Sequence, residues 1–67
     1  MKLTVNGEKK EFPKPLSIAE LLDQLKISSN IRVAVALNGQ VIPKKEHPNT
    51  PLKENDVVEI VRMVGGG

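Results

Sequence analysis

The chain has 67 residues, of which 39% are hydrophobic and 27% charged, with one Phe and no Trp, Tyr or Cys. A chain of this length buries only about 60% of the surface that its unfolded form exposes, which predicts one small domain and excludes a multidomain enzyme with an internal cleft. The lack of cysteine excludes disulfides, thiolate metal sites and cysteine nucleophiles, so stability has to come from an aliphatic core.

The charges are balanced: ten Lys and Arg against eight Asp and Glu give a net charge of +2, and both signs are interspersed. A single aromatic residue and no basic stripe argue against nucleic-acid binding. No segment approaches the roughly 20 consecutive apolar residues that span a bilayer, and the N-terminus turns polar too early for a signal peptide. We therefore expect a cytoplasmic protein without a membrane or nucleic-acid partner.

The first 12 residues predict a β-hairpin. Leu3 and Val5 alternate with polar residues, which is typical of a half-buried strand. Asn6-Gly7 follows, and a type I′ turn needs positive φ at both of its central residues, so residues 8–12 should return antiparallel. The charged return strand has the composition of a sheet edge.

A helix is predicted to follow Pro15. Ser17 and Glu20 have capping-box spacing, and Leu16 before the cap can pack on Leu21 as a hydrophobic staple. Apolar residues then recur at helical spacing, which predicts an amphipathic helix of about two to three turns that ends near Ile27.

The second half predicts three more strands. Residues 31–37 alternate, Asn38-Gly39 predicts a second hairpin, and residues 40–42 should pair back until Pro43. Residues 44–55 contain two prolines and no apolar period, so we interpret them as a surface loop.

Residues 56–64 form the last predicted strand, which is apolar on both faces and therefore suited to the middle of a sheet. Together the elements predict an α+β fold in which a mixed sheet of four to five strands packs on one helix. Residues 1–64 form the predicted domain, and residues 65–67 a flexible glycine tail.

Side-chain catalysis is not indicated. There is no Ser/His/Asp set, no metal-ligand cluster and no phosphate-binding glycine loop. His47, the only histidine, is interpreted as an exposed structural residue of the polar loop, and Lys44 and Lys45 as solvated surface. We predict neither a catalytic residue nor a metal site, and expect a protein that is not an enzyme.

The C-terminus is the candidate functional group. Gly65, Gly66 and Gly67 directly follow the most hydrophobic strand. A glycine run at a chain end is often only a flexible tail, but without Cβ atoms it can also pass through a narrow channel into another protein's active site. The Gly67 carboxylate is a poor electrophile, and its activation as an acyl adenylate requires a nucleotide site, usually with Mg²⁺, in a partner enzyme.

The order of strands and helix, the hairpin of residues 35–43 and above all the ending from Val58 through Gly67 resemble the ThiS family of thiamine-biosynthesis sulfur carriers, which have the ubiquitin-like β-grasp fold. The similarity covers essentially the whole chain. The Gly-Gly ending by itself is shared with MoaD-type molybdopterin carriers and with ubiquitin-like modifiers, whereas the short length and the Glu-Ile-Val run are more similar to ThiS.

The resemblance implies that a ThiF-like enzyme adenylates Gly67 with ATP and Mg²⁺, while the carrier itself binds no cofactor. The adenylate is then converted to a thiocarboxylate with sulfur from a donor such as a cysteine desulfurase. A thiazole synthase similar to ThiG would receive this sulfur. A free carrier of this kind is expected to be a monomer.

Alternation along the last strand predicts the partner surface. Val58 and Ile60 should face the helix, which leaves Val57, Val61 and Met63 on the open face of the sheet, and clustered exposed apolar residues indicate a binding surface. Valines there can also reflect β-propensity alone. In the resembled superfamily an apolar residue shortly before the glycines contacts the activating enzyme, and Val61 matches it in place; Arg62 can add an ionic contact.

Two other functions share these features. A protein modifier would use the same activation but end in isopeptide bonds to lysines, and a β-grasp binding module would function without its glycines. Covalent conjugates would identify the first, and full activity after removal of the glycines the second.

Overall fold

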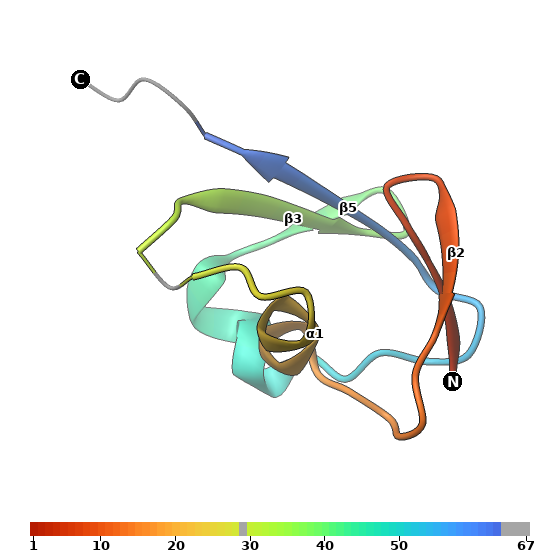
Figure 1. Cartoon of the computed structure of the whole chain (residues 1–67). Coiled ribbons are helices and arrows are strands. Elements are labelled where there is room, and N and C mark those ends of the chain that lie inside the picture. Colours follow the sequence, from red (N-terminus) through yellow and green to blue (C-terminus); the bar gives the residue numbers. More distant parts are fainter. Residues whose placement is uncertain (29, 64–67) are drawn as a thin grey trace.

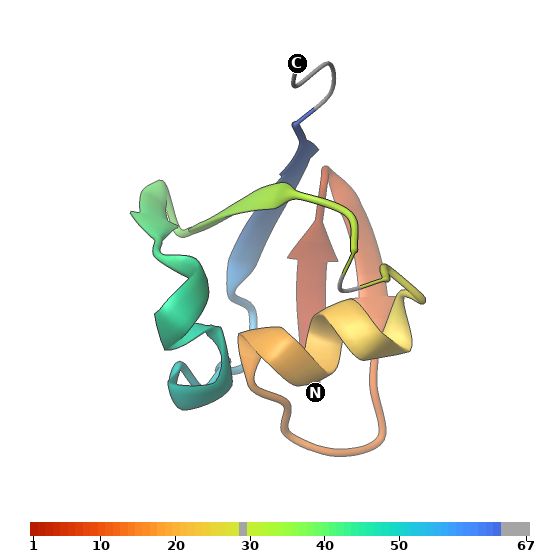
Figure 2. The same cartoon turned by 90° about the vertical axis from the view of Figure 1, so that its left-hand side faces the viewer.

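The computed structural model describes residues 1–28 and 30–63, which form one mixed sheet and one α-helix (Figure 1). Figure 2 shows the helix running across the strands on one face of the sheet. The predicted α+β class and the predicted order of strands and helix are confirmed. The elements are β1 (Lys2–Val5), β2 (Glu8–Glu11), α1 (Ile18–Gln24), β3 (Val33–Leu37), β4 (Gln40–Ile42), the 3-10 helix η1 (Lys44–Asn49) and β5 (Val57–Arg62).

The sheet has five strands in the order β2-β1-β5-β3-β4, so the last strand of the chain lies at its centre. β5 runs parallel to β1 and antiparallel to β3. The predicted central position of this strand is confirmed, although Val57 and Val61 on one of its two faces remain exposed.

Both Asn-Gly dipeptides form the predicted hairpin turns. The φ angles are 50° at Asn6 and 83° at Gly7, and 51° at Asn38 and 88° at Gly39. Positive φ at both central residues is the requirement of the type I′ turn, whose twist matches that of the flanking strands. The turns join β1 to β2 and β3 to β4 as antiparallel pairs.

The predicted capping box begins α1. The Ser17 hydroxyl accepts a hydrogen bond from the Glu20 backbone N–H at 3.2 Å, and the Glu20 carboxylate accepts one from the Ser17 N–H at 2.9 Å. These bonds satisfy two N–H groups that a helix start otherwise leaves without a partner.

The prediction that the helix continues to near Ile27 was wrong, because α1 ends at Gln24. Lys26 adopts a φ of 60°, and the Ile27 N–H donates to the Leu22 carbonyl at 3.0 Å. This left-handed residue with a bond back across the last turn is a Schellman-type ending. Glycine normally marks it in a sequence, and here a lysine occupies the position.

The buried core lies between α1 and the sheet, and it is almost entirely aliphatic. Ile18 and Leu21 of the helix meet Val35 of β3 and Val58 of β5, all with no exposed surface. The core consists of Leu3, Val5, Phe12, Ile18, Leu21, Val35, Leu52 and Val58.

The interpretation of residues 44–55 as a surface loop was partly wrong. Residues 44–49 form η1, and Leu52 is part of the core. The Leu52 N–H donates to the Leu16 carbonyl at 2.8 Å, and Pro51 pairs with Ser17. Because these contacts join segments more than 30 residues apart, the local sequence pattern carries no sign of them. Lys44 and Lys45 are exposed, as predicted.

The predicted domain boundary at residue 64 and the glycine tail, residues 65–67, lie outside the described residues. Within the described part of the chain, no helix is long and apolar enough to cross a membrane.

Substitution of Leu21 tests the core. Leu21→Ala should lower the free energy of unfolding by about 2 to 5 kcal/mol, because it removes fully buried methyl groups and leaves a cavity. Urea denaturation measures this change. Val41→Ala, on an exposed residue of β4, is the control and should change stability by about 0.5 kcal/mol or less. Equal effects of the two substitutions would contradict the assignment of the core.

Candidate functional site

β5, the strand that leads to the C-terminus, is paired along more of its length on one side than on the other. β3 pairs with β5 along its length, from Leu37 opposite Val58 to Val33 opposite Arg62, and the Met63 N–H then donates to the Arg32 carbonyl at 2.9 Å. β1 pairs only with the first part of the strand, through Thr4–Val57 and Val5–Val58. The end of β5 near the C-terminus therefore extends past β1.

An asparagine side chain takes the place of the missing strand residues. The Asn6 Oδ1 atom accepts a hydrogen bond from the Ile60 N–H at 2.7 Å, and its Nδ2 donates to the Ile60 carbonyl at 3.2 Å. The side-chain amide thus binds both polar groups of one β5 residue, as a neighbouring strand would. We call this pair of bonds the Asn6 clamp.

Asn38 makes a similar contact at the opposite end of β5. Its Oδ1 accepts from the Val57 N–H at 2.9 Å, and its Nδ2 donates to the Asp56 carboxylate at 3.1 Å. Sequence analysis identified both asparagines only as turn residues. The sequence signal that was missed is the use of Asn and not Gly at these positions. Both residues tolerate positive φ, but only Asn has a side-chain amide that can form further hydrogen bonds.

The open face of the sheet, opposite α1, carries two of the predicted partner-binding residues. Val57 is 43% exposed and Val61 59% exposed, whereas Val58 between them is fully buried against the helix. The predicted alternation is thus observed in the exposure of these side chains. Arg62 is also exposed, but alternation places it on the same face as Val58.

Further apolar residues extend this surface across β3 and β4. Ala34 lies opposite Val61 in the register, and Ala36 lies between Glu59 on one side and Val41 on the other. Val41 is 68% exposed; its strand was predicted from the sequence, but its place on this surface was not. We call this surface the open-face patch; it consists of Ala34, Ala36, Val41, Val57 and Val61, with Glu59 among them.

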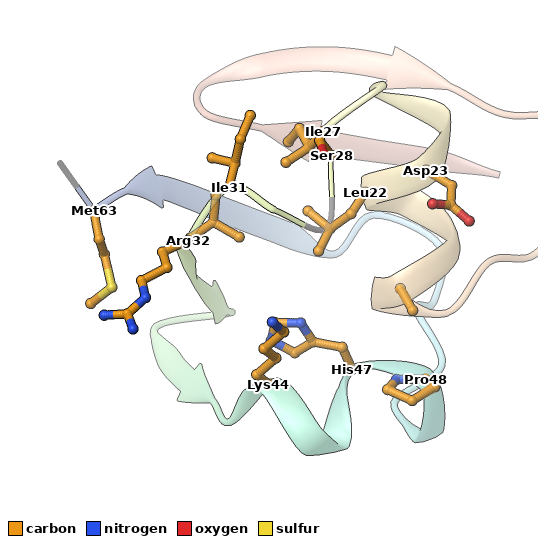
Figure 3. A pocket seen from close by; sticks show the side chains of 12 residues that line it. Leu22, Asp23, Ile27, Ser28, Ile31, Arg32, Lys44, His47, Pro48 and Met63 are labelled. Carbon is orange, nitrogen blue, oxygen red and sulfur yellow. The ribbon is translucent and has the colours of Figure 1, made fainter. Parts of the chain in front are cut away.

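Met63 does not lie with the valines as predicted. It is 60% exposed, but its side chain borders a groove on the helix side of the molecule (Figure 3). Strand pairing ends at Arg62, so the alternation that places Val57 and Val61 no longer governs the next residue. Met63 therefore stands at the edge between the two faces.

The groove has a volume of about 610 Å³ and lies between the end of α1, residues 31–33 and η1. Its lining is mainly apolar, with Leu22 and Ile31 among the side chains that point into it, and Arg32 and Lys44 add two cationic groups (Figure 3). The groove therefore opens beside Met63, the last residue that the structure describes.

His47 lies on the η1 wall of this groove, and the prediction that it is exposed was wrong. Only 4% of its surface is accessible, and its Nε2 lies 3.0 Å from the Ile42 carbonyl. A carbonyl can only accept, so Nε2 carries the proton in this contact. The bond connects η1 to the end of β4, which is a structural role.

Among residues 1–28 and 30–63, no group of three or more His, Asp or Glu residues could hold a metal ion. The candidate site is the end of the central strand β5, which lies between the open-face patch and the groove. The predicted reacting group, Gly67, and the preceding Gly65 and Gly66 lie outside the described residues.

The five-stranded mixed sheet that grasps one helix is the ubiquitin-like β-grasp fold. The crystal structure of the thiamine biosynthesis protein ThiS from Geobacter metallireducens is similar to it with a TM-score of 0.86 and 38% sequence identity, over all of both chains. The sequence profile described as the ThiS family matches residues 3–67. The chain belongs to the ThiS family.

Curated relatives agree with this assignment. The sulfur carrier protein ThiS of Bacillus subtilis is 35% identical over 97% of this chain and 98% of its own, and that of Thermus thermophilus is 36% identical over 94% and 95%. A thiazole synthase of Paramagnetospirillum magneticum is 36% identical over the whole of this chain, which spans only 20% of that relative's length.

The buried histidine supplies a test of the groove wall. His47→Leu should lower the free energy of unfolding by about 1 to 3 kcal/mol, because the Ile42 carbonyl loses its donor in a partly buried place. Chemical denaturation measures the loss. His47→Gln keeps a donor at a comparable position and should restore part of the stability. If His47→Leu is as stable as the wild type, the hydrogen bond between His47 and the Ile42 carbonyl contributes nothing to the free energy of unfolding.

Proposed function

We propose that this protein is a sulfur carrier that supplies sulfur for the thiazole ring of thiamine, with the terminal carbonyl of Gly67 as the carrying group. The observation that supports this most is the extent of the family match, which runs from residue 3 through the terminal glycines to residue 67. The central position of the strand that leads to those glycines agrees with such a role.

The proposed chemistry takes place in partner enzymes. A ThiF-like enzyme, using ATP and Mg²⁺, converts the Gly67 carboxylate to an acyl adenylate and releases pyrophosphate. The terminal sulfur of a donor persulfide, such as that of a cysteine desulfurase, then attacks the acyl carbon and displaces AMP. A thiol cleaves the resulting acyl disulfide by forming a disulfide with the donor sulfur, which leaves a thiocarboxylate. The carrier binds no cofactor and contributes a stable fold, a binding surface and a chain end narrow enough to enter an active site.

A thiazole synthase is the proposed recipient of the sulfur. One relative with that name contains a region 36% identical to this entire chain. A carrier region and a synthase within one polypeptide are held at high effective concentration, which favours transfer between them. We propose that a thiazole synthase is a partner of the present chain, that both are cytoplasmic, and that the carrier is a monomer between encounters.

The proposed contact with the activating enzyme is the open-face patch around Val61, which includes Val57. Met63 at its edge and Arg62, which alternation places on the other face of β5, complete the proposed contact. Val61 and Val57 lie on the strand that leads to Gly67, so an enzyme that takes in the chain end would be placed beside them. Exposed apolar residues that gather on one face are typical of a protein-binding surface.

The terminal residue provides the direct test. After incubation with ATP, the cognate activating enzyme and a sulfur donor, intact-mass spectrometry should show that sulfur replaces one oxygen at the C-terminus. Deletion of Gly67, or addition of one residue after it, should abolish both this product and pyrophosphate release. The melting temperature should stay close to the wild-type value, because the change leaves every residue of the described core in place.

Other outcomes would identify other functions. Failure of the wild-type chain to form a thiocarboxylate with its pathway enzymes would contradict the proposal. Conjugates of higher mass in cell extract would instead indicate a protein modifier, and full activity without Gly67 an ordinary binding module.

The binding surface is tested with Val61→Asp. A charge in the centre of the proposed contact should raise the Kd for the activating enzyme by about tenfold or more. Stability should fall by only about 1 kcal/mol or less, because Val61 lies outside the core. Gln24→Glu, which also adds one negative charge but at an exposed position of α1, on the other face of the sheet, is the control and should leave the Kd near the wild-type value. An unchanged Kd for Val61→Asp would remove Val61 from the interface. Titration calorimetry gives the Kd of each variant.

A further inference from the structure

The Asn6 clamp lies where β5 has no strand on one side. β1 pairs with β5 as far as Val58, and the Asn6 N–H adds one backbone bond to the Val58 carbonyl at 2.9 Å. Beyond this point the chain turns away at Asn6-Gly7. The side-chain amide of Asn6 alone continues along β5, and it bonds both the N–H and the carbonyl of Ile60.

The position of Ile60 makes this contact important for the chain end. Ile60 is three residues before Met63, the last described residue, and the β3 side of this region is already paired through Val33–Arg62 and Met63–Arg32. A strand paired on one side only can bend or separate from its neighbour more easily than one paired on both. The clamp supplies the second side.

We infer that Asn6 is a positioning residue, which keeps the end of β5 in the sheet and so sets the direction in which the chain leaves it towards Gly67. The inference rests on the proposed function, because direction matters only if a partner takes in the chain end. If the end of β5 were loose, the partner would have to order it on binding, and that cost would lower its affinity for the carrier.

The chain contains a matched control for this role. Asn6 and Asn38 both begin type I′ turns with positive φ, and each makes two side-chain bonds next to β5. Replacement by Gly preserves the turn in both cases, because Gly adopts positive φ without strain. Only Asn6 acts near the C-terminal end of β5, whereas Asn38 acts at its beginning. N6G and N38G therefore remove similar bonds at opposite ends of one strand.

The first measurement is amide hydrogen exchange by NMR, which needs no partner enzyme. In N6G the Ile60 N–H loses its acceptor and should exchange about tenfold faster or more, whereas the Val61 N–H points towards β3 and should change only with global stability. N38G should leave Ile60 close to the wild-type rate. The second variant, N6D, keeps the acceptor for the Ile60 N–H but replaces the donor to the Ile60 carbonyl with an oxygen, so it should restore only part of the protection.

The second measurement is ATP-dependent pyrophosphate release by the activating enzyme, with the carrier as varied substrate. N6G should raise KM by about threefold to tenfold, the range that one hydrogen bond of modest net strength represents, with little change in kcat. N38G should leave KM near the wild-type value. A loss of stability alone changes neither constant while the carrier remains folded.

The outcomes separate the two proposals. Unchanged Ile60 exchange in N6G, or equal KM values for N6G and N38G, would overturn the inference about Asn6 while the carrier function stands. Absence of pyrophosphate release with the wild-type chain would overturn the proposed function, and the predicted change in KM could then not arise. Faster exchange of the Ile60 N–H in N6G would still establish the Asn6 clamp.

Discussion

The pairing of β5 on both sides is the interaction on which the rest of the structure depends. This strand is the last in the chain but the middle one in the sheet, so β1 and β3, and through them both hairpins, join only when β5 is in place. Val58 completes the core against Ile18 and Leu21, and the same strand continues towards the C-terminal glycines. The fold is therefore stabilised by the element that also carries the proposed function.

Strand geometry lets this one element serve both purposes. Successive side chains point to opposite faces, so Val58 is buried against the helix while Val57 and Val61 remain exposed on the open face. The exposed valines can bind a partner without removing contacts from the core. A chain of 67 residues can in this way hold both a buried core and an exposed apolar surface on one strand.

The two asparagines show a similar double use. Each adopts the positive φ that its turn requires, and each also directs an amide to β5, where it bonds backbone groups that no strand reaches. Small sheets have many edge positions relative to their size, and unpaired backbone groups at an edge leave the strand free to fray or to pair with other chains. A side-chain amide resembles a peptide group closely enough to take their place.

Much of the fold follows from the sequence because its signals are local. The capping box at Ser17, the Asn-Gly turns, the apolar character of β5 and the exposure of Val61 each depend on residues a few positions apart, and all were predicted. Four features were not predicted: the end of the helix at Gln24, the burial of His47 and Leu52, the turn of Met63 towards the groove and the Asn6 clamp. Asn6 and Ile60 are 54 positions apart, and His47 is buried only because η1 packs beside α1. The sequence by itself thus determined the elements, the alternating faces and the family resemblance. Only the tertiary structure decided which distant groups meet, because those contacts form when β5 enters the sheet.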